Sequence, residues 1–182
     1  MRTLLVSGIL LIFIVVQLWQ GVDAKKTIDG DGSGYYAYLT AVLHYKTTDF
    51  KAVFDYEKSQ RGLDYMGHYF HEYKGKTVNK YYLGTALLIL PFYLLAMLYS
   101  KMAFLPLDGY NIIFQYAVGL AAAFYLALGL LLTNALLKTF NITKPLRLLV
   151  LLSLMLGTNL FYYAFLHPAH SHVYSFAAIA AL

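Results

Sequence analysis

The sequence contains no cysteine, a single tryptophan and few charged residues. The absence of cysteine excludes disulfide bonds and thiolate chemistry, but it does not indicate a cellular compartment. Charged residues make up 13% of the 182 residues, whereas a soluble domain carries about 25%. The net charge of +5 is scattered along the chain, so it does not indicate a nucleic-acid partner. We therefore expect a membrane protein and not a soluble domain.

Hydrophobic residues make up 60% of the sequence and are gathered into long runs. A transmembrane helix needs about 20 apolar residues, so the pattern predicts an all-α integral membrane protein. Spans are expected at 3–19, 112–137 and 148–166, and residues 173–182 begin a fourth. Ten residues do not cross a bilayer, so we expect the natural protein to continue. The first run is expected to be an uncleaved helix, with a signal peptide as the alternative. Both interpretations place the segment that follows on the outer side of the membrane.

A large outer loop is expected between the first two spans, at residues 20–111. Residues 29–34 (Asp-Gly-Asp-Gly-Ser-Gly) are expected to form a flexible turn. A short amphipathic helix should follow at 35–45, and then an irregular surface. The apolar segment 81–100 carries Pro91 at its middle, and proline kinks or breaks a helix. The segment is expected to lie at the interface as juxtamembrane helices, and a spanning helix is the alternative.

The position of segment 81–100 decides which loops share a side of the membrane. If it stays on the outer face, the short loop with Lys138, Lys144 and Arg147 is cytoplasmic, as the positive-inside rule favours. The loop with Asp29 and the histidine turn at 167–172 then both face outside. This is the expected topology.

Two groups of polar residues are candidates for chemistry. Asp29 and Asp31 are available as a general base or as metal ligands, although Asp and Gly are also ordinary turn residues. His167, His170 and His172 are ligands suited to Zn²⁺ or another transition metal, although histidine-rich turns are often inert surface. The sequence therefore leaves a divalent metal open.

Two further features are weaker candidates. His68, His71 and Glu72 lack the His-Glu-x-x-His order of a zinc protease, so solvated surface is the expected role. Lys80 directly precedes the apolar segment, where a cation faces anionic headgroups or a lipid phosphate. A plain solvated loop is the alternative for Lys80.

Three stretches resemble the polytopic glycosyltransferases of the GT-C type, specifically family 39, the protein mannosyltransferases and the related bacterial aminoarabinose lipid A transferases. The stretch from Asp31 to Tyr35 (Asp-Gly-Ser-Gly-Tyr) resembles the family's first outer loop. The stretch from Lys80 to Pro91 resembles its juxtamembrane segment, and the histidine turn falls where the family has a second outer loop. Gly32 stands beside Asp31 where the family commonly has a second acidic residue.

The resemblance implies a GT-C-type multi-span bundle in the plasma (inner) membrane with its active site facing outside. It implies inverting transfer of a sugar from a polyprenyl-phosphate donor to a hydroxyl on a lipid, glycan or protein. Asp31 is the candidate general base. The candidate substrate-binding residues are Asp29, Tyr35, Lys80, His167, His170 and His172. The alternative functions are a transporter or lipid flippase and a non-catalytic membrane subunit.

Overall fold

The computed structural model describes residues 2–20, 27–64 and 68–182. Most of these residues are helical, and two helices among them are long and apolar enough to cross a membrane. Residues 21–26 and 65–67 belong to the expected outer loop and lie outside the described residues. The helices are α1 (Arg2–Gln20), α2 (Gly30–Leu39), α3 (Lys51–Arg61), α4 (Gly84–Met102), α5 (Ile112–Thr139), α6 (Lys144–Leu156), α7 (Leu160–Phe165) and α8 (His172–Ala180).

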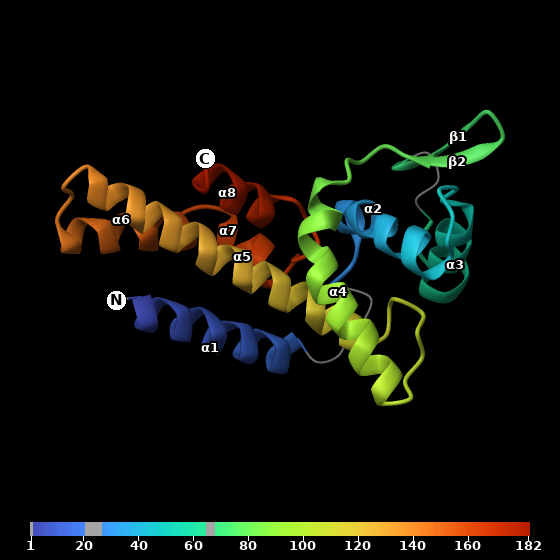
Figure 1. The fold of residues 1–182 in the computed structure, drawn as a ribbon, viewed down its shortest axis with the longest axis horizontal. Helices are drawn as coiled ribbons and strands as arrows, with labels where there is room; N and C mark the ends of the chain where they lie inside the picture. The colour runs from blue at the N-terminus through green and yellow to red at the C-terminus, as the bar shows by residue number, and fades with distance from the viewer. Residues whose placement is uncertain (1, 21–26, 65–67) are drawn as a thin grey trace.

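The apolar body of the molecule is built around α5, which contacts α1, α4, α6, α7 and α8 (Figure 1). With 28 residues, α5 is about 42 Å long. Gly129 allows α8 to approach closely, because a Cβ atom there would lie 2.5 Å from the Phe176 ring. The prediction of a long apolar helix at 112–137 is confirmed, and α5 is one of the two candidate spans.

The helix expected at 148–166 is instead two helices, α6 and α7, which are separated at Gly157–Asn159. The Thr158 hydroxyl donates a hydrogen bond to the Leu154 carbonyl and accepts one from the Leu160 backbone N–H. These local bonds end one helix and begin the next. Glycine also has poor helix propensity, which favours an interruption here.

Pro91 does not break α4, which runs without interruption from Gly84 to Met102 and is the second candidate span. The two short helices considered for this segment are therefore one helix. Proline removes a single backbone donor, and the remaining bonds together with the packing of Tyr93 against Phe114 (ring centroids 4.9 Å apart) maintain the helix. Tyr81, before α4, and Tyr110, after it, both bond to residues of the polar end described next.

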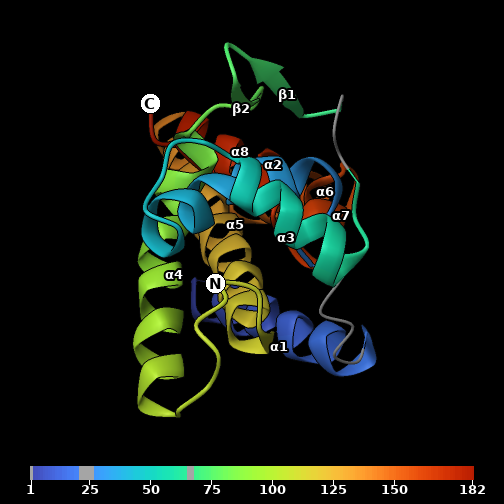
Figure 2. The ribbon, with the colours of Figure 1, turned by 90° about the vertical axis from the view of Figure 1, so that its right-hand side faces the viewer.

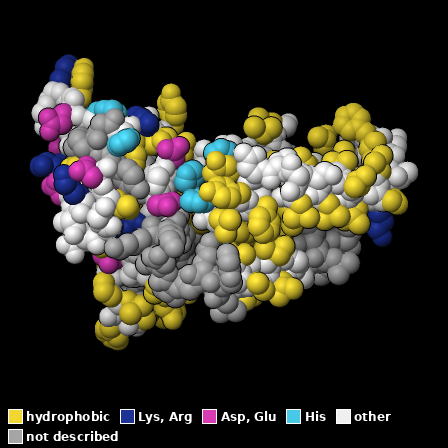
Figure 3. All heavy atoms as spheres, turned by 180° about the vertical axis from the view of Figure 1, so that it is seen from behind, with side chains coloured by type: hydrophobic (Ala, Val, Ile, Leu, Met, Phe, Trp, Pro, Cys, Tyr) yellow, Lys and Arg dark blue, Asp and Glu magenta, His cyan; other side chains and the backbone are white. Residues whose placement is uncertain are grey.

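A polar end is formed by α2, a π-helical turn at Thr40–His44, α3 and a hairpin of β1 (Phe70–Tyr73) and β2 (Lys76–Asn79). The strands are antiparallel with Phe70 opposite Asn79. Figure 2 faces this end of the molecule. Figure 3 shows most of the charged side chains gathered over it, whereas hydrophobic side chains predominate elsewhere and Lys or Arg side chains reappear at the opposite end. The irregular surface that we expected after residue 45 thus includes a helix and a hairpin.

The flexible turn expected at 29–34 is wrong, because α2 begins at Gly30. Asp29 occupies the N-cap position and Asp31 lies in the first turn, where a helix dipole favours negative charge. The glycines serve close packing: a Cβ atom on Gly32 would lie 2.6 Å from Cβ of Ala169, and one on Gly34 would lie 2.2 Å from the Tyr81 ring. The first turn of α2 is therefore held against the histidine turn.

Candidate functional site

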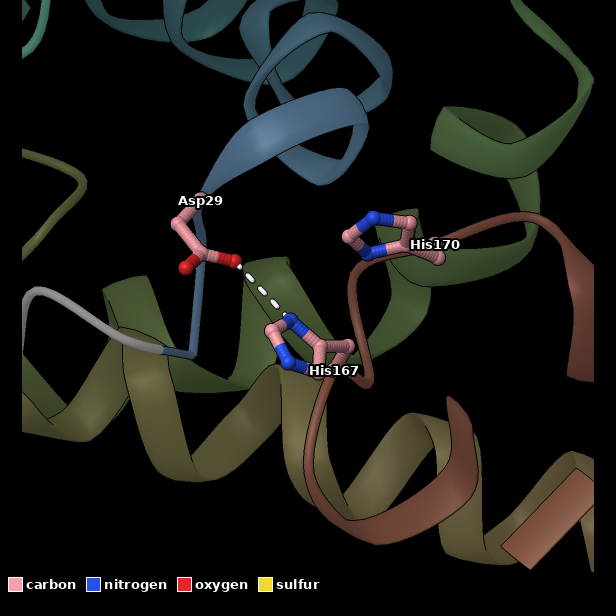
Figure 4. Close-up of side chains that lie close together, drawn as sticks. All are labelled: Asp29, His167 and His170. Atoms are coloured by element: carbon pink, nitrogen blue, oxygen red, sulfur yellow. Dashed lines mark hydrogen bonds and ion pairs between the residues drawn. The ribbon is translucent and has the colours of Figure 1, made fainter. Parts of the chain in front are cut away.

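Asp29 and His167 are brought together where the polar end meets the apolar body. Oδ1 of Asp29 lies 3.2 Å from Nδ1 of His167, and both side chains are partly buried (Figure 4). Asp29 comes from the N-terminus of α2, and His167 follows α7. The contact joins the acidic segment to the histidine turn, whereas their expected location on the outer side of the membrane stays a prediction.

His170 completes a group of three with Asp29 and His167. One ligand atom from each residue lies within 4.8 Å of the others, and Figure 4 shows the His170 ring facing the Asp29 carboxylate and the His167 ring. Nδ1 of His170 is buried and has no hydrogen-bond partner among the described residues. Burial, and then the neighbouring His167, lower the pKa of His170, while Asp29 and Asp31 act in the opposite direction. The neutral imidazole, which keeps a lone pair for a ligand, is thereby favoured.

Two tyrosines hold the histidine rings in place. Tyr163 stacks on His172 with ring centroids 3.6 Å apart and an angle of 2° between the planes. Tyr162 stacks on His167 at 4.7 Å. His172 is not part of the group of three ligand atoms, so the structure assigns it a place beside the cluster.

Asp31 belongs to a second, adjoining group. It is exposed, and its Oδ1 accepts a hydrogen bond from the Tyr81 hydroxyl. Burial, and then this bond to Asp31, raise the pKa of Tyr81, so Tyr81 remains a donor. The Tyr81 ring packs against Tyr35 at 4.5 Å and lies 5.1 Å from Nζ of Lys80. Tyr81 thus joins three of the predicted site residues, and the sequence reasoning missed it.

A cavity of about 330 Å³ lies beside Tyr35, between the start of α4 and the start of α8. Its wall includes Tyr82 and Thr85 from one side and Ser171 and Tyr174 from the other. The cavity combines aromatic rings with hydroxyl groups, which is the mixed lining that binds small polar molecules. Tyr35, which packs against Tyr81, places this partly open cavity beside the Asp31 group.

A buried ion pair supports the site from within the polar end. Glu57 is fully buried and Arg61 is 6% exposed, with Nη1 of Arg61 3.4 Å from Oε1 of Glu57. Hydroxyl groups of Tyr69 and Tyr110 donate to the same carboxylate at 2.8 and 3.1 Å. Burial raises the pKa of Glu57, while Arg61 and the two hydroxyls favour its charged form.

The same arginine fixes the residue that precedes Asp29. Nη2 of Arg61 donates to the carbonyl of Ile28, and the Ser33 hydroxyl donates to that carbonyl at 3.2 Å. Glu57 and Arg61 are spaced by four residues, a spacing at which helical side chains meet. The spacing was a readable signal for the pair, but only packing reveals that it is buried.

No family model, curated protein or solved structure matches this chain. The resemblance to the GT-C glycosyltransferases therefore rests on the short stretches described above.

Proposed function

We propose that this protein is a membrane glycosyltransferase with the GT-C-type multi-span architecture. It would move a sugar from a polyprenyl-phosphate donor to an acceptor hydroxyl at the outer face of the plasma membrane, with inversion. The observation that carries the proposal is the position of Asp31. Its exposed carboxylate lies in the first turn of α2 and acts electrostatically on His170 and His172. Through Tyr81 it is linked to Tyr35, which lines the cavity.

The reaction assigns a distinct role to Asp31. The acceptor oxygen attacks the anomeric carbon from the face opposite the phosphate, and its proton passes to Asp31 as general base. The carbon–oxygen bond to the lipid phosphate breaks, and the phosphate leaves with the bonding electrons. The Tyr81 hydroxyl bonds to one oxygen of Asp31 and would orient the other towards the acceptor.

The leaving phosphate needs positive charge or hydrogen-bond donors as its own charge develops. Lys80 is exposed and lies against the Tyr81 ring, so its ammonium group is within reach of an anion near Asp31. The cavity beside Tyr35 and Tyr82 offers aromatic faces for a sugar ring. The helices of the apolar body would accommodate the polyprenyl tail of the donor.

Two structural relationships support the membrane arrangement. The residues that flank α4, Tyr81 and Tyr110, both bond within the polar end, which favours an α4 that stays on one face of the membrane. The basic turn joins the far end of α5 to α6, with Lys138 in the last turn of α5 and Lys144 at the start of α6. That turn would be cytoplasmic, in agreement with the positive-inside rule.

The proposal is tested with the natural protein in isolated membranes. Purified polyprenyl-phosphate hexose and pentose donors are added with membrane extract as the acceptor source, and release of polyprenyl phosphate is measured. Asp31→Asn should lower the rate about 10²–10⁴-fold, which is the usual contribution of a general base. Asp55→Asn is the matched control, because Asp55 lies on the exposed face of α3 and pairs with Lys51. Full activity of the Asp31 variant would refute the assignment.

A further inference from the structure

The Asp29, His167 and His170 side chains present one oxygen and two nitrogen donors to a common point. The three ligand atoms lie within 4.8 Å of one another, and the pair Asp29 Oδ1–His167 Nδ1 is 3.2 Å apart. In a tetrahedral zinc site, with bonds of about 2.0–2.1 Å, two donor atoms are separated by about 3.4 Å. The Asp29–His167 pair lies close to this separation, and the third donor lies within 4.8 Å of both.

The chemistry of these donors selects the class of ion. Two imidazoles and one carboxylate suit zinc and its neighbours among the transition metals, whereas Mg²⁺ and Ca²⁺ prefer oxygen ligands alone. The buried, unpartnered Nδ1 of His170 is costly without a partner, and a cation would provide one. We propose that Asp29, His167 and His170 bind a zinc-class divalent ion, with at least one coordination position left for water or another oxygen ligand.

The surroundings of the three residues are those of a built site. Tyr162 stacks on the His167 ring and so limits its rotation. Gly32 allows α2 to contact Ala169, the residue before His170. Restraint of ligand orientation by neighbouring groups is a regular feature of metal sites. The ion would join the N-terminus of α2 to the turn between α7 and α8, segments that are more than 130 residues apart in the chain.

Metal binding is tested by measurements that do not depend on glycosyl transfer. The natural protein is purified in detergent, stripped with dipicolinate and titrated with Zn²⁺ and with Co²⁺. We expect one equivalent to bind, a Co²⁺ absorption spectrum of a nitrogen- and oxygen-ligated tetrahedral ion, and a higher thermal midpoint. Asp29→Asn, His167→Gln and His170→Gln should each weaken binding by more than the roughly 10–100-fold caused by loss of an outer-shell partner.

His172→Gln and Asp31→Asn are the matched controls. Both residues are neighbours of the three ligands but lie outside the group, and both variants should keep one equivalent of metal. The thermal midpoint of each metal-free variant shows whether it folds. Absence of stoichiometric binding in the parent protein, or equal loss in the His172 control, overturns the proposal. Because the Asp31 variant should lose transfer and retain metal, failure of the metal site and failure of the proposed function are distinguishable.

Discussion

The hydroxyl group of Tyr81 donates a hydrogen bond to the carboxylate of Asp31, across 50 residues of sequence. Tyr81 directly precedes α4, and Asp31 lies in the first turn of α2. The bond therefore connects the candidate base to the segment that leads into the apolar body. It gives Asp31 a defined orientation despite its exposure.

Removal of this hydroxyl should impair transfer. Tyr81→Phe is expected to lower the turnover rate about tenfold or more, because a hydrogen bond to a charged group contributes about 1.5–3 kcal/mol and about 1.4 kcal/mol corresponds to a factor of ten. Release of polyprenyl phosphate in isolated membranes measures the rate. Tyr73→Phe, at an exposed position of the hairpin, is the control. An unchanged rate for the Tyr81 variant would show that Asp31 needs no such orientation.

The buried ion pair should be a major contributor to the stability of the polar end. Arg61→Ala leaves the fully buried Glu57 without its cation, and breaking a buried pair costs about 3–5 kcal/mol. Lys51→Ala breaks the exposed pair with Asp55 and should cost less than about 1 kcal/mol. Thermal unfolding in detergent compares the two variants. Equal midpoints would contradict the structural role of Arg61.

Gly32 should tolerate no side chain, because its Cβ atom would lie 2.6 Å from that of Ala169. Gly32→Ala is expected to cost about 1–3 kcal/mol through overpacking and to separate α2 from the histidine turn. Gly84→Ala is the control, since nothing lies within 4 Å of the added atom. The free energy of unfolding measures both. A Gly32 variant as stable as the control would show that the turn moves freely.

The two ends of α5 should face opposite sides of the membrane. Thr48, at the polar end, and Thr143, in the basic turn, are both exposed, and the sequence has no cysteine. In intact cells, a membrane-impermeant maleimide should label Thr48→Cys, whereas Thr143→Cys should react only after permeabilisation. The reverse labelling pattern would place Asp31 on the cytoplasmic side and remove the basis for an outer-face enzyme.

The sequence by itself was sufficient to predict that the chain is mainly helical and to locate its longest helix. The long, mainly apolar stretch of α5 predicts a helix, because a helix satisfies its backbone hydrogen bonds within the segment. The prediction that the segments of Asp29 and His167 share the outer side of the membrane stays a prediction, although the two side chains are in contact. These inferences depend on local hydrophobicity and on the direction of the chain.

Only the tertiary structure decided how the polar residues are used. Asp29 and Asp31 are only two residues apart in the sequence, yet one pairs with His167 and the other with Tyr81. Glu57 has the pattern of an exposed helix pair but is fully buried. The reason is physical: a helix pattern depends on residues a few positions apart, whereas a hydrogen bond or a buried charge depends on side chains that only packing brings together.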